Sequence, residues 1–459
     1  MYPLQCVSQE GRMSAMRSPE LLVVPEHASA SAATPGLDFQ PALCRIALVG
    51  FGTVGSAVAR LLQARRTEHR LQLTHVCNRD IARKRVDWIA RDVVWTESIE
   101  HVLASHSDVV VELMGGLRPA YDLVRRALES GKSVVTANKQ LIAHCGAELQ
   151  QLAKDNGQYL GFGACVAGGV PVLSGLQDGL AGDRIVQIRG ILNGTCNYIL
   201  SRIEKAGISF ADALSEAQQA GFAEADPSFD IDGQDAGAKL AILARVGLKV
   251  GVSPERVLCR TIRHLSAIDF EYAHELHCTI RQISTGVQRD GDVYLAVQPS
   301  LVSNDSPLAK VSGSQNLIVS TGQFGGETMF GGYGAGGDPT AVAVLSDLFQ
   351  AAGYQSDRPA AADLPQVAER EPKLDIASPH YVRFVVRDRV GIIALLAGAF
   401  ARHGLNLDAI LQKPGFNKSA LPFVVTIEPC GQKQLDDALQ EIGGFDFLVE
   451  APVSMPIVS

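Results

Sequence analysis

The sequence predicts an α/β protein with three parts: a parallel sheet covered by helices, a second region of α+β structure, and a small C-terminal unit of β-α-β-β-α-β pattern. Short apolar runs alternate with helical stretches from Arg45 onward, which is typical of a parallel sheet with helices on both faces. A glycine-rich turn joins the first run to the first helix. A stretch rich in Pro, Ala and Asp then sets the C-terminal unit apart.

Composition limits the class of protein. The chain has 459 residues, a length that suggests about three domains, and its 46% hydrophobic and 20% charged residues are typical of a soluble protein with a large core. The net charge of −8 argues against a nucleic-acid partner, which usually binds a basic face. The nine cysteines form no CxxC pair, and no apolar run approaches the roughly 18 residues that span a membrane. We therefore expect a cytoplasmic protein that binds no membrane.

The predicted elements of the first two regions follow one another in order. Strands are predicted at 45–50 (RIALVG), 71–77 (LQLTHVC), 108–115 (DVVVELMG) and 133–139 (SVVTANK), with helices between them. The second region, 166–330, has strand-like segments at 185–194 and 293–302 around long helices, and it resembles an α+β substrate-binding and dimerisation domain. Residues 331–360 are expected to return to the first domain.

The glycine-rich turn carries the strongest local signal. Gly50, Gly52 and Gly55 form a G-x-G-x-x-G motif that ends the first strand and opens the first helix. The first glycine permits the tight turn, the second lets the backbone approach a pyrophosphate, and the third lets helix and strand pack closely. The motif predicts a Rossmann-type dinucleotide-binding domain over residues 41–165. The other residues of the turn are Phe51, Thr53 and Val54.

The residues after the second strand bear on which dinucleotide binds. A site that prefers NAD carries an acidic residue there, whereas this chain has Cys77-Asn78-Arg79-Asp80. The guanidinium of Arg79 can grip the 2′-phosphate of NADP. In the alternative, Arg79 is solvated and Asp80 holds the ribose of NAD. The sequence thus favours NADP and leaves NAD open.

The segment GFAEADPSFDIDGQDAGAK has several acidic residues before a single lysine: Glu224, Asp226, Asp230, Asp232, Asp235 and Lys239. Local structure accounts for some of them. Asp226 suits a turn, Asp232 suits a helix N-cap, and Asp235 with Lys239 suits an i,i+4 ion pair. Neither a cap nor a helix face requires Glu224 or Asp230, so these two need a functional explanation.

Five segments occur in an order that points to one enzyme family: VVTANKQLIA, GACVAGGVP, GILNGTCNYIL, GFAEADPSFDIDGQDAGAKLAILA and GYGAGGDPTAVAVLSDL. Together they resemble homoserine dehydrogenase over about residues 44–348, and the acid-rich segment is the most specific of them. The resemblance implies an enzyme that interconverts L-homoserine and L-aspartate 4-semialdehyde with NAD(P)(H), in the pathway to threonine, methionine and isoleucine.

The resemblance also implies roles for individual residues. Lys239 matches the family's proton-donating lysine, and Lys139 matches a lysine beside the nicotinamide and the substrate. Other matches are the substrate-binding acids Glu224, Asp230 and Asp235, and the cofactor-contacting glycines Gly221 and Gly336. These roles are chemically consistent, because carboxylates suit the ammonium group of a zwitterionic substrate and Lys239 can protonate the aldehyde oxygen as hydride arrives. Lys139 can stabilise the same developing charge or hold the substrate carboxylate.

One departure from the family concerns a monovalent cation. The family often has a glutamate where this chain has Gly163, and that carboxylate helps to bind the ion. The backbone carbonyls of Val166, Gly168 and Val170 can still ligate Na⁺ or K⁺. Without the carboxylate, the site is expected to be weaker.

The C-terminal region, residues 377–459, has the pattern of a ferredoxin-like unit. It resembles an ACT domain, a regulatory module that binds amino acids, and Asp388, Gly391 and Asn406 match positions usually near the ligand. The resemblance implies a homo-oligomer with an amino-acid effector, threonine by the logic of the pathway. In the alternative, the unit only dimerises.

Composition also predicts where the parts end. Residues 1–40, rich in Ser, Ala and Pro, are expected to be a disordered extension, and residues 361–376 a linker. Such a linker implies few contacts across it. A chain that ends near residue 363 is therefore expected to keep its sheet and its active site.

Two other functions fit part of the pattern. An acylating semialdehyde dehydrogenase would need a thiolate nucleophile, for which Cys196 and Cys165 are the candidates, but neither has a histidine near it in the sequence. A nucleotide-binding amino-acid sensor without turnover is the second alternative. The two lysines together with the acidic residues argue against it.

Overall fold

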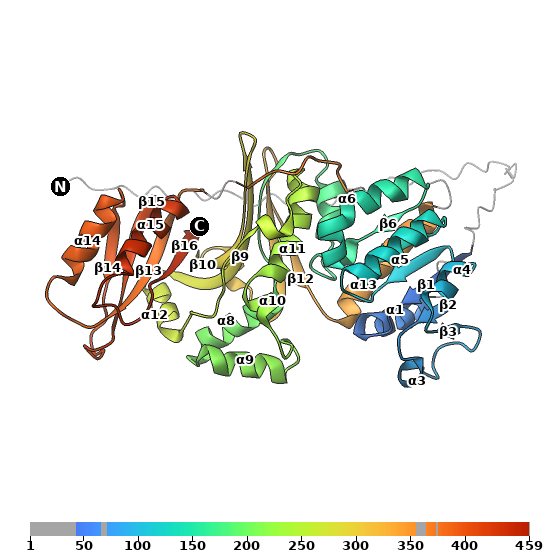
Figure 1. The fold of residues 1–459 in the computed structure, drawn as a ribbon, viewed down its shortest axis with the longest axis horizontal. Coiled ribbons are helices and arrows are strands. Elements are labelled where there is room, and N and C mark those ends of the chain that lie inside the picture. The colour runs from blue at the N-terminus through green and yellow to red at the C-terminus, as the bar shows by residue number, and fades with distance from the viewer. Residues whose placement is uncertain (1–42, 66–70, 355–363, 373–374, 459) are drawn as a thin grey trace, which may run out of the picture. The chain divides into compact units, whose positions relative to one another are not determined.

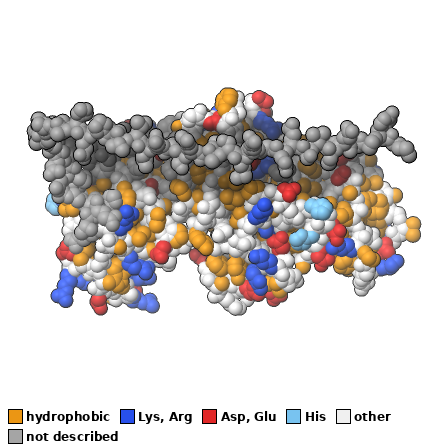
Figure 2. Space-filling model, turned by 180° about the vertical axis from the view of Figure 1, so that it is seen from behind, with side chains coloured by type: hydrophobic (Ala, Val, Ile, Leu, Met, Phe, Trp, Pro, Cys, Tyr) orange, Lys and Arg blue, Asp and Glu red, His pale blue; other side chains and the backbone are white. Residues whose placement is uncertain are grey.

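The computed structural model describes residues 43–65, 71–354, 364–372 and 375–458 of the chain (Figure 1). The extension expected at 1–40 and part of the linker expected at 361–376 lie outside these residues. Within the described part of the chain, no helix combines the length and the hydropathy needed to cross a membrane. On the face drawn in Figure 2, Lys and Arg side chains lie among Asp and Glu side chains and form no continuous basic surface over the described residues.

The first sheet is parallel, with strand order β3-β2-β1-β4-β5-β6. Its strands are β1 (Cys44–Val49), β2 (Leu71–Cys77), β3 (Val94–Thr96), β4 (Val109–Glu112), β5 (Ser133–Thr136) and β6 (Leu160–Gly161). The order is that of a Rossmann fold, which binds its ligands outside the carboxyl ends of the strands. The strands predicted from apolar runs are confirmed, whereas β3 and β6 are too short to show a period.

Helices cover both faces of this sheet (Figure 1). They are α1 (Thr53–Ala64), α4 (Ile99–Ala104), α5 (Arg118–Glu129), α6 (Lys139–Asp155) and α13 (Gly337–Tyr354), whereas the short helix α3 (Ile81–Lys84) after β2 has no buried residue. The side chains of β1 alternate between the faces, as strand geometry requires. Ala47 and Val49 belong to the core with α5 and α6, whereas Ile46 and Leu48 belong to the core with α1 and α13.

The second region contributes a sheet and several helices; the sheet is antiparallel except for the parallel pairing of its short strand β8 with β10. Its strands are β7 (Ile185–Ile191), β8 (Leu258–Cys259), β9 (Cys278–Arg289), β10 (Asp292–Ser303), β11 (Gln315–Gly322) and β12 (Gly326–Tyr333). Its helices are α7 (Val172–Ser174), α8 (Gly194–Ala206), α9 (Phe210–Gln219), α10 (Ser228–Ile231), α11 (Gln234–Leu243) and α12 (Ala267–Glu275). The strands predicted within 185–194 and 293–302 are confirmed as β7 and β10.

The C-terminal unit has the predicted β-α-β-β-α-β order. Its elements are β13 (Ser378–Val386), α14 (Ile392–Arg402), β14 (Leu407–Leu411), β15 (Leu421–Cys430), α15 (Gln432–Ile442) and β16 (Val453–Val458). The strand β16 pairs antiparallel with β13 and parallel with β10 (Figure 1). The two sheets therefore form one ten-stranded sheet in the order β12-β11-β7-β9-β10-β16-β13-β15-β14, with β8 also beside β10.

The expectation of few contacts between this unit and the preceding region is wrong. Tyr381 and Met455 share one hydrophobic core with Tyr272 of α12. The buried carboxylate of Asp269 accepts hydrogen bonds from the Tyr381 hydroxyl at 2.9 Å and the Arg383 guanidinium at 2.8 Å. The composition of the linker describes only that segment. It carries no information about the pairing of β16 with β10, which joins the two regions.

Candidate active site

The glycine-rich turn closes tightly against the end of β4. Gly50 has φ +102°, and a Cβ built there would lie 2.5 Å from the carbonyl oxygen of Leu113. A Cβ at Gly55 would lie 2.1 Å from the carbonyl oxygen of Gly50, so α1 can approach β1 only without a side chain. No atom lies within 4 Å of a Cβ built at Gly52. The turn thus leaves space above the N-terminus of α1, where phosphates bind.

A pocket of about 480 Å³ opens beside the turn, within the range of about 300–1,000 Å³ that is usual for ligand sites. Gly50, Phe51 and Gly52 line it from the turn, and Arg79 lines it from the end of β2. The Phe51 N–H donates to the Asn78 side chain at 3.1 Å, which ties the turn to the second strand. The volume of this pocket and its position at the glycine-rich turn suit a dinucleotide.

Asp80, the alternative ribose ligand, has a structural role. It is the N-cap of α3, and its carboxylate accepts a hydrogen bond from the Arg83 N–H at 3.2 Å. The Arg83 guanidinium also lies 3.9 Å from it. Arg79, by contrast, is exposed and lines the pocket, while Asp80 is absent from the described lining residues.

Gly336 lies near the turn, whereas Gly221 is the first residue of the acid-rich segment. Gly336 directly precedes α13, and a Cβ built at the next residue, Gly337, would lie 3.2 Å from Thr53 at the start of α1. The first residue of α13 is therefore in contact with the first turn of α1, which begins with Thr53 and Val54. Gly221 follows α9 with φ +76°, next to Phe222, whose carbonyl accepts from the Thr195 hydroxyl at 2.7 Å.

Lys139 begins α6 immediately after β5, at the carboxyl edge of the parallel sheet. Asn138 caps this helix by accepting from the Leu141 N–H at 3.2 Å. The Asn138 amide also donates to the Gly116 carbonyl at 2.6 Å, which fixes the helix start to the loop after β4. The position of Lys139 is therefore set by two strand ends.

Glu112 helps to fix the start of α6 through hydrogen bonds, and the sequence analysis did not predict this role. Its fully buried carboxylate accepts from the Thr136 hydroxyl at 2.6 Å and the Met114 N–H at 2.7 Å. The Thr136 hydroxyl in turn accepts from the Asn138 N–H at 2.9 Å. Burial raises the pKa of Glu112, against the effect of these hydrogen bonds. In the sequence, a single acidic residue at the end of an apolar strand looks the same whether it is exposed to solvent or buried in such a network.

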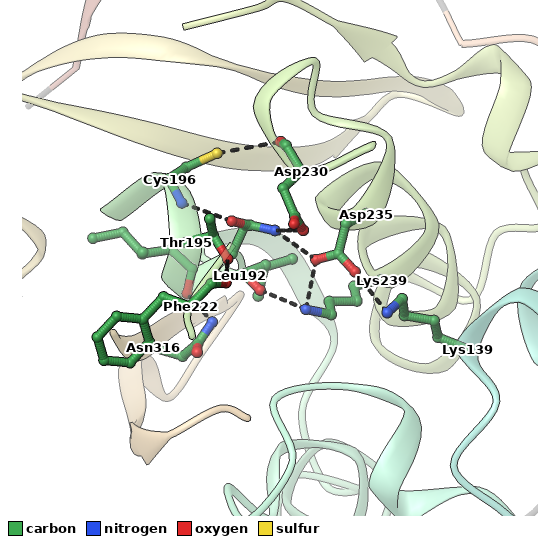
Figure 3. Close-up of polar contacts among 11 residues, drawn as sticks. Lys139, Leu192, Thr195, Cys196, Phe222, Asp230, Asp235, Lys239 and Asn316 are labelled. Atoms are coloured by element: carbon green, nitrogen blue, oxygen red, sulfur yellow. Dashed lines mark hydrogen bonds and ion pairs between the residues drawn. The ribbon is translucent and has the colours of Figure 1, made fainter. Parts of the chain in front are cut away.

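The centre of the site is Asp235, whose carboxylate lies between two lysines (Figure 3). Its Oδ1 is 2.8 Å from Lys139 Nζ, and its Oδ2 is 2.7 Å from Lys239 Nζ. Burial opposes ionisation of Asp235, but the charges of Lys239 and Lys139 outweigh it and lower the pKa of this carboxyl well below its ordinary value. Lys239 also donates to the Leu192 carbonyl at 2.8 Å, and its side chain is only 12% exposed against 35% for Lys139.

Asn193 joins a second acid to the cluster. Its side-chain amide donates to Asp230 at 2.6 Å and to Asp235 at 2.9 Å, and its own carbonyl accepts from the Cys196 N–H at 2.8 Å as the N-cap of α8 (Figure 3). Burial and the nearby charge of Asp235 raise the pKa of Asp230. Asn193 was missed because an Asn-Gly-Thr sequence at a helix start is fully explained as a cap.

The remaining acids of the segment differ from expectation in part. Asp226 forms the predicted turn, since its carboxylate accepts from the Ser228 N–H at 3.1 Å. The prediction that Asp232 is an N-cap is wrong: α11 begins after Gly233, and Asp232 pairs with Arg263 at 2.9 Å. The guanidinium of Arg263, which is distant in the sequence, binds the carboxylate in place of the backbone N–H groups at the helix start. Glu224 is exposed, and no described residue binds its carboxylate.

A carboxylate from another element, that of Asp347, lies where a side chain at position 163 would be. Asp347 of α13 accepts from the Gly163 N–H at 2.8 Å, and its Oδ1 would lie 2.8 Å from a Cβ built at Gly163. Burial raises the pKa of Asp347 to about 7. Gly168 and Val170 line the adjacent pocket of about 340 Å³ together with Asp347. Val166, just before them in the chain, is fully buried.

The two candidate nucleophiles are buried thiols. Burial raises the pKa of Cys165 and of Cys196 well above the ordinary value. The Cys196 thiol donates to the Asp230 carbonyl at 3.2 Å, and the Cys165 thiol to the Thr136 carbonyl at 3.5 Å. Burial and nearby carboxylates outweigh the opposing charge of Lys139 at Cys165 and of Lys239 at Cys196, so neither site favours a thiolate.

The three predicted effector residues lie in the C-terminal unit. Gly391, with φ +91°, is the N-cap of α14. Asp388 forms an ion pair with Lys418 at 3.3 Å, and the Asn406 amide donates to Glu428 at 3.1 Å. Both polar side chains thus already have partners within the unit.

Three family models match the chain in succession. They describe the NAD-binding domain of homoserine dehydrogenase at residues 50–162, homoserine dehydrogenase at 171–349 and the ACT domain at 380–445.

Known proteins match over nearly the whole chain. Homoserine dehydrogenase of Synechocystis sp. is 37% identical, over 90% of this chain and 99% of that one. Homoserine dehydrogenase of Helicobacter pylori is 35% identical, over 89% and 97%. Among solved structures, a homoserine dehydrogenase from Thiobacillus denitrificans superposes with a TM-score of 0.84 at 31% identity, over 91% and 98%. A hyperthermophilic archaeal homoserine dehydrogenase in complex with NADPH gives 0.60 at 28% identity, over 70% and 99%.

Proposed function

The chain belongs to the homoserine dehydrogenase family, and from that premise we propose which of its residues carry out the reaction. The enzyme is an NAD(P)-dependent oxidoreductase that interconverts L-homoserine and L-aspartate 4-semialdehyde in amino-acid biosynthesis. The double ion pair of Asp235 with Lys139 and Lys239 carries the assignment of roles. It brings three charged groups together beside the carboxyl edge of the parallel sheet.

Lys239 is the proton donor in the proposed mechanism. Bound nicotinamide cofactor supplies hydride to the aldehyde carbon of the substrate. Lys239 Nζ donates a proton to the aldehyde oxygen as negative charge develops there, and it takes the proton back in the reverse direction. Lys139, the more exposed lysine, stabilises the same oxygen. Asp235 holds both amines in place through its two ion pairs. Burial lowers the pKa of Lys139, but the charge of Asp235 outweighs it and raises this pKa above its ordinary value.

Substrate binding uses the acids around this centre. We propose that Asp230 and Glu224 bind the ammonium group of the substrate. Asp230 is held by Asn193, whereas the carboxylate of Glu224 is exposed and reaches the substrate from the loop after α9. The positions of the two acids suit a ligand that enters between the loop and the buried cluster.

We propose that the cofactor is NADP, with NAD as the weaker ligand. Arg79 lines the dinucleotide pocket, where its guanidinium can bind the 2′-phosphate in bidentate fashion. Asp80 is already engaged as the cap of α3, which makes it a poor ligand for the ribose. The turn at 50–55 and the backbone at Gly336 bind the rest of the dinucleotide.

We also propose a monovalent cation, Na⁺ or K⁺, bound by backbone carbonyls of Val166, Gly168 and Val170. Asp347 supports this site, because its carboxylate lies where a side chain at Gly163 would begin. A cation would bind the deprotonated carboxylate and so compete with the proton. K⁺ or Na⁺, compared with choline, should raise the Tm at pH 8, and Asp347→Asn should abolish the rise. The site is contradicted if Tm responds equally to all three cations.

Regulation and assembly complete the proposal. The ACT-type unit responds to an amino acid, with threonine as the first candidate. The chain assembles into a homo-oligomer. The edge strand β12 supports this, because it exposes Met329 and Tyr333 at 48% and 62%, and Phe324 in the turn before it is exposed at 83%. An exposed apolar edge strand favours pairing with another chain. Light scattering on the purified full chain measures the oligomeric state.

The test of the activity is direct. Purified enzyme with L-aspartate 4-semialdehyde should oxidise NADPH, and L-homoserine should reduce NADP⁺, each more efficiently than the corresponding NAD reaction. Phosphate-dependent reduction of NADP⁺ by the semialdehyde would instead identify an acylating enzyme. Absence of turnover in either direction would leave only the nucleotide-binding sensor.

A further inference from the structure

The start of α8 contacts the acid-rich segment at several points (Figure 3). The Thr195 hydroxyl donates to the Phe222 carbonyl at 2.7 Å, and the Cys196 thiol donates to the Asp230 carbonyl at 3.2 Å. Both of these contacts are made to the backbone of the segment. The side chain of Asn193, at the same helix start, instead contacts carboxylates, and so it bears on the charge of the site.

The orientation of the Asn193 amide is fixed by the backbone. Its carbonyl oxygen accepts from the Cys196 N–H at 2.8 Å, and a backbone N–H can only donate. The amide nitrogen therefore faces the acids and gives one hydrogen to Asp230 Oδ1 at 2.6 Å and the other to Asp235 Oδ2 at 2.9 Å. Asn193 is only 4% exposed, so this bridge is buried within the fold.

The two carboxylates joined by Asn193 have different surroundings. Asp235 forms ion pairs with Lys139 and Lys239, whereas Asp230 forms none with the residues that the structure describes. Burial and the charge of Asp235 raise the pKa of Asp230. The hydrogen bond from Asn193 is the largest effect that lowers this pKa, ahead of the charges of Lys239 on α11 and Lys139 on α6. Asn193 thus favours the ionised form of Asp230, which binding of an ammonium group requires.

We propose that Asn193 is a positioning residue for the reaction. It holds the two carboxylates apart, so that Asp235 stays with the lysines and Asp230 stays ionised and available to the ammonium group of the substrate. Without the two amide hydrogens, the neighbouring carboxylates would repel each other, and Asp230 would more readily take up a proton. This role rests on the functions proposed above for Asp230 and Asp235.

The test separates this role from that of a helix cap, because Asn193 has both. Ser and Asp cap helices about as well as Asn does. Asn193→Ser keeps an acceptor for the Cys196 N–H but lacks the two amide hydrogens, and Asn193→Asp places a third carboxyl beside the two acids. Each variant should keep its fold by circular dichroism and raise the KM for homoserine about tenfold or more, with a smaller loss of kcat.

Two further readouts distinguish positioning from stability. In both variants the acidic limb of the pH profile of kcat/KM should move to higher pH, since Asp230 loses the hydrogen bond that favours its ionised form. Ser209→Ala is the matched control, because Ser209 caps α9 by accepting from the Asp212 N–H at 3.1 Å. It should lower the Tm and leave both the KM and the pH profile unchanged.

A double substitution identifies the acid through which Asn193 acts. Asp230→Asn alone should raise the KM, and the addition of Asn193→Ser should raise it little further. The positioning role is overturned if a folded Ser or Asp variant has the KM and pH profile of the unsubstituted enzyme, or if the two effects simply multiply. An unchanged KM in Asp230→Asn would overturn the role proposed for Asp230 itself, and with it that of Asn193.

Discussion

Asp235 holds two lysines that reach it from different parts of the chain. Lys239 is one helical turn away on α11, so the sequence alone predicts that ion pair. Lys139 arrives from α6, almost a hundred residues earlier, and only the fold brings it to the other oxygen. The two contacts differ in predictability because one is local and the other is tertiary.

Removal of either lysine should impair catalysis. Lys239→Ala and Lys139→Ala should each lower kcat by about 10² or more, since a positioned acid or charge stabilises mainly the transition state. Steady-state kinetics measures the effect, and circular dichroism with Tm verifies that the fold remains. The exposed Lys205→Ala on α8 serves as the control. Near-normal kcat in both active-site variants would remove the assigned roles.

Glu224→Ala should act through substrate affinity. Its exposed carboxylate has no partner among the described residues, so the substitution should leave the stability almost unchanged. The expected result is a raised KM for homoserine with little change in kcat, because the ammonium group is bound equally in the ground and transition states. An unchanged KM with a large loss of kcat would place Glu224 in the chemical step.

Arg79→Ala should discriminate between the two cofactors. Loss of the guanidinium should weaken NADPH binding more than NADH binding, because only NADPH carries the 2′-phosphate. Fluorescence titration of each cofactor measures the two Kd values. Arg83→Ala, an exposed arginine on the adjacent helix α3, is the matched control. Equal losses for both cofactors would favour a ribose contact by Asp80.

At the scale of elements, α13 contributes a buried acid to another part of the fold. Burial raises the pKa of Asp347 from the ordinary value of 3.8 to about 7. Between these values the folded protein keeps a proton that the unfolded chain releases, so the group's contribution to stability falls as pH rises through this interval. Above pH 7 the carboxyl is ionised in both states, and the free energy of unfolding is lowered by the full cost of burying its charge.

The substitution Asp347→Asn removes that dependence. The Tm of the variant minus the Tm of the unsubstituted enzyme should rise between about pH 4 and 7 and level off above, in a buffer free of Na⁺ and K⁺. Scanning fluorimetry at four or more pH values measures it. For Asp305→Asn, an exposed position, the difference should stay flat. A flat difference for Asp347→Asn as well would mean that the carboxyl is ionised throughout.

The elements that sequence predicted well are those with a strong local pattern. The strands around the glycine-rich turn have apolar runs and a steric requirement for glycine, so the fold of this domain and its class as a dinucleotide-binding domain followed from them. Asp232 was misassigned because Arg263, a residue of another segment, takes its carboxylate. Asn193, Glu112 and Asp347 share this limit: each acts through partners that only tertiary structure brings near.

At the scale of the whole molecule, the C-terminal unit is part of the structure of the preceding region. A chain that ends at residue 363 would lose Tyr381, Arg383 and Met455, so that the core they share with Tyr272, together with Asp269, would be exposed to water. We therefore expect a markedly lower Tm and reduced solubility for that truncated chain, in contrast to the expectation from linker composition. Calorimetry and gel filtration measure both.

A second substitution identifies the cause. In the full chain, Asp269→Asn should lower the Tm by leaving Arg383 with fewer acidic partners, whereas in the truncated chain, where Arg383 is absent and the position faces water, it should have little effect. A truncated chain with unchanged Tm and full activity would contradict the structural role of the C-terminal unit.

The pairing of β16 with β10 also sets an order of events during synthesis. Leu301 and its partner Ile457 are separated by roughly 155 residues, which the ribosome adds in about 8–30 s at 5–20 residues per second. During that interval, the emerging edge of β10 has no partner from β16. The nascent chain thus carries an open sheet edge until nearly all of the described sequence has been translated, and chaperones that shield such edges have a defined period in which to act.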